Sequence, residues 1–88
     1  MATIEKKAWP ELFEPILSGK KKYDLRLNDF EVNEGDILVL KEWDPNTKMY
    51  TGREISKKVT YVRKFSLRDL FWPREEIEKH GLQILSLE

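Results

Sequence analysis

The sequence predicts a small α+β fold in which about six short strands curl into a mixed β-barrel, with two or three short helices beside it. The chain has 88 residues, the size of one domain spanning residues 1–88. Four prolines and four glycines are spread along the chain and separate short elements, about six of which have the character of strands. A sheet of this many short strands hides its edges when it closes, which favours a barrel.

The composition limits the kinds of site that the chain can build. Cysteine is absent and His80 is the only histidine, so a zinc site and a Cys/His catalytic pair lack their residues. We therefore expect neither a metal nor a cofactor. Sixteen basic residues balance sixteen acidic ones, so any surface for nucleic acid must be local. No stretch suits a signal peptide or a membrane span, and we expect a cytoplasmic protein without a membrane partner.

A first helix is predicted over residues 10–18, after a weak strand in TIEKKA. Pro10 suits the first helical turn and Gly19 suits the C-terminal cap. Pro15 inside the segment should shorten or kink the helix, because proline lacks a backbone donor. The apolar residues that recur with helical spacing are Trp9, Leu12, Phe13, Ile16 and Leu17. We expect Trp9 to be a core anchor of this helix.

The next segment, residues 23–28, alternates with a period of two and predicts a half-buried strand. Its apolar face would carry Tyr23, Leu25 and Leu27, and its polar face Asp24, Arg26 and Asn28. These polar side chains are candidates for a site.

A central strand and a hairpin are predicted next. The apolar series at residues 37–40 is bounded like a central strand, and WDPNTKMYTGREI indicates a hairpin with a turn at residues 44–46. Gly52 is a candidate bulge in the returning strand, where it would re-aim Arg53. Strand character then continues through KKVTYV.

Two short helical pieces and a last strand are predicted towards the C-terminus. Ser66 and Asp69 have the spacing of a capping box. Pro73 can open a second turn, and Gly81 can end it. The apolar tail GLQILSLE is expected to pair with another strand.

The segment SGKKKYDLRLND, residues 18–29, raises the main functional question. If the backbone bends near Lys21, then its ammonium, the carboxylate of Asp24 and the guanidinium of Arg26 can converge. Lys21 and Arg26 would then hold an anionic or carbonyl-bearing ligand, while Asp24 orients one of them or accepts a proton. The plain alternative is a solvated strand face, which is the more common outcome for charges of this kind.

The stretch GKKKYDLR carries a glycine-x-lysine-x-x-acid-x-arginine signature, and in this the chain resembles the ASCH domain family of the PUA-like superfamily. WPELFEPILSGKKKYDLRLND, EGDILVLKEWDP and YTGRE extend the resemblance to compact bacterial, archaeal and phage members, over roughly the first two thirds of the chain. It implies a PUA-like barrel whose cleft, between a helix and the sheet, binds RNA or a nucleotide. The chain departs from the family pattern at two positions. Asp24 stands where the family usually has glutamate, and Glu5 stands where some members carry histidine.

The leading functional prediction is a small module that binds RNA or a nucleotide. Arg53 would reach a phosphate and Trp43 would stack on a base, although core packing suits Trp43 and Trp72 equally well. The predicted binding residues are Lys21, Asp24, Arg26, Asn28, Arg53 and Trp43.

Two alternatives stay open. Some ASCH relatives are hydrolases, including an acetylcytidine amidohydrolase that uses the signature lysine and a distant glutamate. Lys21 matches that lysine, whereas Asp24 departs from the threonine that this relative has at the acid position. In this alternative Lys21 activates a water or holds an oxyanion and Asp24 is the general base, and the substrate is a modified nucleoside or RNA. The distant carboxylate would be Glu42, Glu75 or Glu76. In the second alternative the hairpin KEWDPNTKMYTGRE is a contact surface for another protein. The sequence leaves the oligomeric state open.

Overall fold

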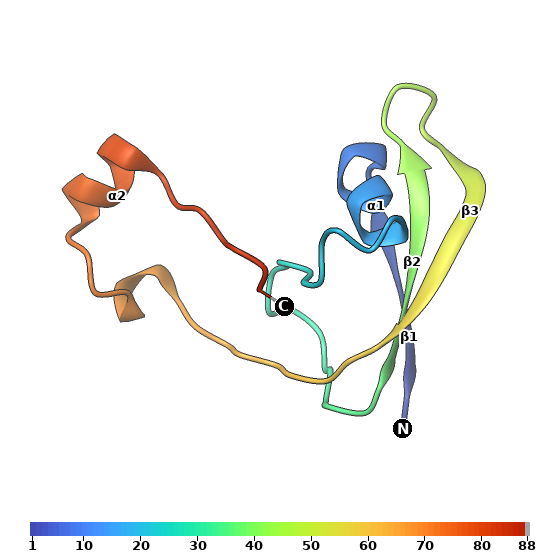
Figure 1. The fold of residues 1–88 in the computed structure, drawn as a ribbon, viewed down its shortest axis with the longest axis horizontal. Coiled ribbons are helices and arrows are strands. Elements are labelled where there is room, and N and C mark those ends of the chain that lie inside the picture. The colour runs from blue at the N-terminus through green and yellow to red at the C-terminus, as the bar shows by residue number, and fades with distance from the viewer. Residues whose placement is uncertain (88) are drawn as a thin grey trace.

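The computed structural model describes residues 1–87, in which three strands form one open sheet (Figure 1). The strands lie in the order β1-β2-β3, with β1 parallel to β2 and β3 antiparallel to β2. The elements in chain order are β1 (Thr3–Ala8), α1 (Pro10–Leu17), β2 (Ile37–Asp44), β3 (Met49–Lys58), the 3-10 helix η1 (Leu67–Asp69) and α2 (Arg74–His80). The fold is a small α+β arrangement.

The core lies between α1 and the sheet. Phe13 and Ile16 of α1 pack with Ala8 of β1 and Leu40 of β2, and all four are buried. The predicted helix at residues 10–18 is confirmed, with proline in its first turn and Gly19 beyond its end in the left-handed region. The expectation that Trp9 anchors the core is wrong, because Trp9 precedes the helix and is 48% exposed.

A buried carboxylate fixes the start of the parallel pair. Asp36 accepts hydrogen bonds from the backbone N–H groups of Ala2 and Asn33, each at 2.9 Å. These two bonds lower the pKa of Asp36. They tie the turn before β2 to the residue before β1, which holds the two strands in register from Thr3 opposite Ile37 onward.

The predicted central strand, hairpin and bulge are confirmed. Lys41 pairs with Glu54, but Trp43 pairs with Tyr50, so β3 carries extra residues opposite this part of β2. Gly52 lies within these extra residues at a φ of 96°, a conformation that favours glycine.

The predicted six-stranded barrel is wrong. Across residues 1–87 the sheet has three strands, and residues 23–28, 59–62 and 82–87 join no strand ladder. The apolar residues of these segments fit any half-buried surface, but a strand also needs a partner for its backbone groups. Without those additional strands the sheet does not close, and β1 and β3 remain its outer strands.

Residues 59–87, which we call the arm, leave the sheet after β3 and carry η1 and α2 away from it (Figure 1). The two predicted helical pieces are confirmed, including the capping box of Ser66 with Asp69 and the end of α2 at Gly81. No residue of the described arm is buried. The helices described between residues 1 and 87 are all too short or too polar to cross a membrane.

Candidate functional site

A groove of about 970 Å³ lies between residues 21–32 and residues 57–67. Leu38 and Leu40 of β2 also contribute to its lining. The groove therefore joins the segment after α1, the end of β3 and the beginning of the arm. These parts lie far apart in the sequence, so periodicity alone does not predict their meeting.

The lining of the groove is strongly basic. Asp24 is the one acidic residue among the lining residues, against seven cationic ones: Lys21, Lys22, Arg26, Lys57, Lys58, Arg63 and Lys64. The chain as a whole has no net charge. Positive charge is thus concentrated at one place, and a cleft with one sign of charge raises the local concentration of anions.

Aromatic rings lie among these cations. The groove is also lined by Tyr23, Phe30, Tyr61 and Phe65. The Nζ atom of Lys21 lies 4.9 Å from the centroid of the Tyr23 ring, within cation–π range. The groove therefore offers charged groups and flat apolar surfaces together.

Asp24 and Arg26 form a pair at the edge of the groove. Both carboxylate oxygens of Asp24 accept hydrogen bonds from the guanidinium of Arg26. The Nη2 atom of Arg26 also donates to the backbone carbonyl of Lys7, at 2.9 Å. Arg26 therefore fastens the segment after α1 to the end of β1, in addition to lining the groove.

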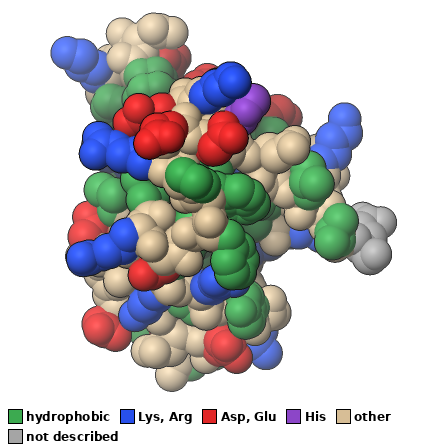
Figure 2. All heavy atoms as spheres, turned by 90° about the vertical axis from the view of Figure 1, so that its left-hand side faces the viewer, with side chains coloured by type: hydrophobic (Ala, Val, Ile, Leu, Met, Phe, Trp, Pro, Cys, Tyr) green, Lys and Arg blue, Asp and Glu red, His purple; other side chains and the backbone are tan. Residues whose placement is uncertain are grey.

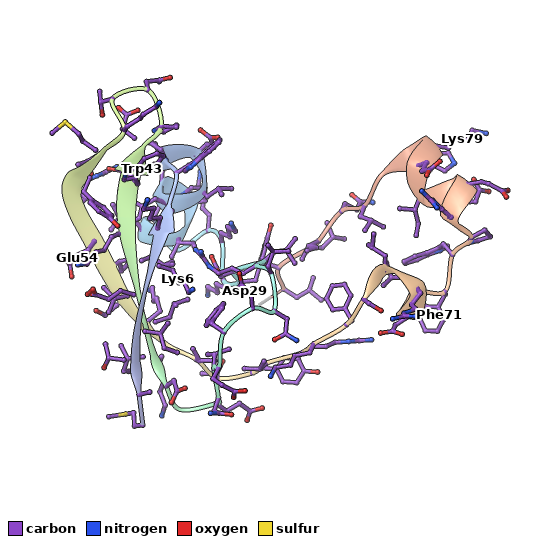
Figure 3. All side chains as sticks on the ribbon, turned by 180° about the vertical axis from the view of Figure 1, so that it is seen from behind. Lys6, Asp29, Trp43, Glu54, Phe71 and Lys79 are labelled. Atoms are coloured by element: carbon purple, nitrogen blue, oxygen red, sulfur yellow. The ribbon has the colours of Figure 1, made fainter. Side chains whose placement is uncertain are left out.

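Four of the six predicted site residues line the same groove, namely Lys21, Asp24, Arg26 and Asn28. Arg53 and Trp43 are not in its lining. Figure 3 shows Trp43 towards the hairpin end of the sheet, apart from Asp29 in the segment after α1. The Nζ atom of Lys7 lies 4.5 Å from the centroid of the Trp43 ring. Trp43 is thus engaged by a side chain of this chain.

Arg53 belongs to a second cluster, around the buried carboxylate of Glu42. Glu42 is 3% exposed and accepts hydrogen bonds from Arg53 Nε at 2.9 Å, Arg53 Nη2 at 2.8 Å and Thr51 Oγ1 at 2.6 Å. The bonds from Arg53, and then that from Thr51, lower the pKa of Glu42 to about 2. Arg53 also pairs with Glu14 of α1, and its guanidinium lies over the ring of Phe13.

This second cluster joins the hairpin to α1. The bonds to Glu42 and Glu14 raise the pKa of Arg53, so it stays charged. Of the three distant carboxylates considered from the sequence, Glu42 is held by this cluster. Glu75 and Glu76 are exposed in the first turn of α2, outside the groove lining.

Sequence reasoning missed half of the groove's charge. Lys57, Lys58, Arg63 and Lys64 lie at the two ends of a stretch that was predicted to be strand. Their spacing as two basic pairs around VTYV was the available signal. In the described residues, no group of three or more His, Asp or Glu side chains is arranged to hold a metal ion.

Comparisons with known proteins found a matching family model and a similar phage protein. The family model "Domain of unknown function (DUF3850)" matches residues 3–72, which include the sheet, α1 and the groove segments. The chain is 36% identical over 67 residues to the "Uncharacterized 12.9 kDa protein in GpA 3'region" of Escherichia phage P2. That match covers 75% of this chain and 60% of the relative, so the chain spans about 60% of the relative's length. No solved structure matches the chain. Because the model covers most of the chain, the protein belongs to the DUF3850 family.

Proposed function

We propose that the basic groove binds single-stranded RNA or a nucleotide. The observation that carries this proposal is the separation of charge: seven cationic residues and one carboxylate line the groove of a chain that is neutral overall. Such a concentration of positive charge suits phosphates, which supply most of the affinity for nucleic acids. The four aromatic residues add flat surfaces on which unpaired bases can stack.

Single strands fit this groove better than a duplex. A duplex hides the faces of its bases, whereas a single strand exposes them to aromatic side chains. The groove volume of about 970 Å³ has room for a nucleotide unit between the two basic sides. Tyr23 and Tyr61, which come from opposite sides of the groove, are the rings that we assign to stacking.

The hydrogen bonds that Asp24 accepts favour binding over hydrolysis as the function of the groove. Its two carboxylate oxygens both accept hydrogen bonds from Arg26, so neither is positioned as an unengaged general base. Arg26 in turn is held by the carbonyl of Lys7. The pair is better suited to keeping the groove in shape than to moving a proton.

The resemblance to the ASCH signature supports the same groove. Lys21, Asp24 and Arg26 match the charged signature positions, and all three line the groove. The open sheet differs from the barrel of the PUA-like superfamily, so the proposed relationship rests on the signature and not on the sheet.

The proposal is tested by removing groove charge without touching the residues that hold the fold. In one double variant, Lys58→Gln with Lys64→Gln, two exposed cations of the groove are neutralised. The matched control, Lys48→Gln with Lys79→Gln, removes the same charge at two exposed positions outside the groove lining. Both are titrated with a fluorescent single-stranded RNA at several salt concentrations.

We expect the groove variant to bind roughly tenfold more weakly than the wild type at low salt. Each phosphate contact that is lost should reduce the slope of log affinity against log salt by about 0.7 for a single strand. The control should match the wild type within a factor of about two. Absence of binding at low salt, or equal losses in both double variants, would overturn the proposal.

A further inference from the structure

One side of the groove carries cations that no part of the described chain neutralises. Opposite it, on the side formed by residues 21–32, Arg26 is already paired with Asp24. The other side has two neighbouring pairs of exposed cations, which we call the β3 pair (Lys57 and Lys58) and the arm pair (Arg63 and Lys64). Within residues 1–87 none of these four side chains forms an ion pair or a hydrogen bond. These cations can therefore bind phosphates without breaking a contact of the protein.

An extended stretch of chain separates the β3 pair from the arm pair. No turn or bend interrupts residues 59–66, and Figure 1 shows this part as a long open curve between β3 and η1. An extended chain advances about 3.3 Å per residue, so Lys58 and Arg63 lie about 16 Å apart along it. A single phosphate cannot contact both pairs. The phosphates of a nucleoside triphosphate are clustered at one end of the molecule and also reach only one pair.

Flat apolar surface lies between the two basic pairs. Tyr61 belongs to the stretch that separates them, and it lines the groove together with Tyr23 from the other side. Figure 2, which views the molecule from the side of the arm, shows Lys and Arg side chains next to hydrophobic ones. Cations that follow a backbone, with aromatic rings between them, are how proteins hold single strands. The arrangement therefore fits a strand that runs along residues 57–64.

We propose that the groove takes an oligonucleotide strand of about five nucleotides, with phosphates on the β3 pair and on the arm pair and bases stacked between them. This inference rests on the proposed function, and it chooses the strand over the single nucleotide. A stacked strand advances about 3.4 Å per nucleotide, so about 16 Å corresponds to about five nucleotides, and to fewer when the strand is stretched. A strand that reaches both pairs binds more tightly, because its second contact is intramolecular.

The first test measures affinity against strand length. Oligoadenylates of one to eight nucleotides, each with a 5′-phosphate, compete with a fluorescent octamer for the wild-type chain. Affinity should rise at least about tenfold between two and six nucleotides, because only the longer strand reaches both pairs. ATP should compete no better than the dinucleotide. A peptide of six glutamates carries charge without bases, and it should compete at least about tenfold more weakly than the hexanucleotide.

The second test assigns the gain with length to the two pairs. One double variant, Lys57→Gln with Lys58→Gln, removes the β3 pair, and another, Arg63→Gln with Lys64→Gln, removes the arm pair. Each should bind the hexanucleotide at least about tenfold more weakly than the wild type does. The dinucleotide should lose only about twofold, since it can use either pair. The control double variant from the groove test, at positions 48 and 79, should match the wild type at both lengths.

The outcomes separate this inference from the function on which it rests. An affinity that stays the same from one to eight nucleotides, or ATP that competes as well as the hexanucleotide, would overturn the inference and leave nucleotide binding in place. Equal losses of the dinucleotide and the hexanucleotide in the pair variants would do the same. A glutamate peptide that competes as well as the hexanucleotide, or no binding of any strand at low salt, would overturn the proposed function as well.

Discussion

Among single residues, Glu42 has the clearest energetic consequence, because its carboxylate is buried and depends on Arg53. Removing a partner from a buried carboxylate costs on the order of 3 kcal/mol, since the remaining charge is neither solvated nor paired. Arg53→Ala should therefore lower the urea midpoint of unfolding clearly. The control is Arg74→Ala, which removes an exposed pair with Glu78 in α2 and should leave the midpoint almost unchanged. Equal midpoints for the two variants would contradict the assigned role of Arg53.

The lowered pKa of Glu42 predicts how stability changes with pH. The ordinary value of 4.5 applies to the unfolded chain, whereas the folded value is about 2. As the pH falls below about 4.5, the unfolded state takes up the proton before the folded state does. The contribution of Glu42 to the free energy of unfolding is therefore lost progressively, down to about pH 2. The full difference is about 3 kcal/mol. Urea unfolding over this range should show a shallower decline for Glu42→Gln, with the remaining slope due to groups such as Asp36.

The sequence alone predicts that the groove residues lie together, but it does not predict the contact between Arg53 and Glu42. Lys21, Asp24 and Arg26 are neighbours in the chain, so any local bend keeps them together. Arg53 meets Glu42 only after the hairpin has formed and Gly52 has shifted the register. One signal was available: Glu42 is in phase with Leu40, and a period of two places it on the core face. A buried carboxylate on that face requires a cation nearby.

Among the elements, the β2–β3 hairpin depends on the bulge at Gly52. Its φ of 96° is strained for a residue with a side chain, although a Cβ there would meet no atom within 4 Å. The cost of Gly52→Ala should thus come from the backbone alone, about 1 to 2 kcal/mol in urea unfolding. Gly52→Asn should cost less, because asparagine tolerates this region better. A larger loss for asparagine than for alanine would show that space, and not φ, limits this position.

Elements that carry their own boundary signals were predictable, and those that need a distant partner were not. The helix at residues 10–17 has proline at its start and glycine after its end, and β2 with its hairpin has local turn residues. Residues 23–28 alternate regularly, and residues 82–87 are mostly apolar. Neither segment forms a ladder, because an apolar pattern describes which side chains are buried and not where the backbone finds its hydrogen bonds.

At the scale of the whole molecule, the chain divides into a packed part and an extended part. Every buried residue lies between Ala8 and Glu42, and none lies in the arm. The radius of gyration is 14.8 Å, whereas a compact chain of this length has about 12 Å. Hydrophobic burial stabilises the sheet with α1, whereas the arm gains less of it, because its apolar residues are at most half-buried.

Amide hydrogen exchange tests this division. In dilute solution the amides of β2 should exchange slowly, because they are hydrogen-bonded beside the core, while those of the arm exchange quickly. Isolated helices as short as the seven residues of α2 are marginal in water, so α2 should be unprotected in the monomer. Mass spectrometry of peptides from both parts measures this. An arm protected as strongly as β2 would contradict this division of the chain.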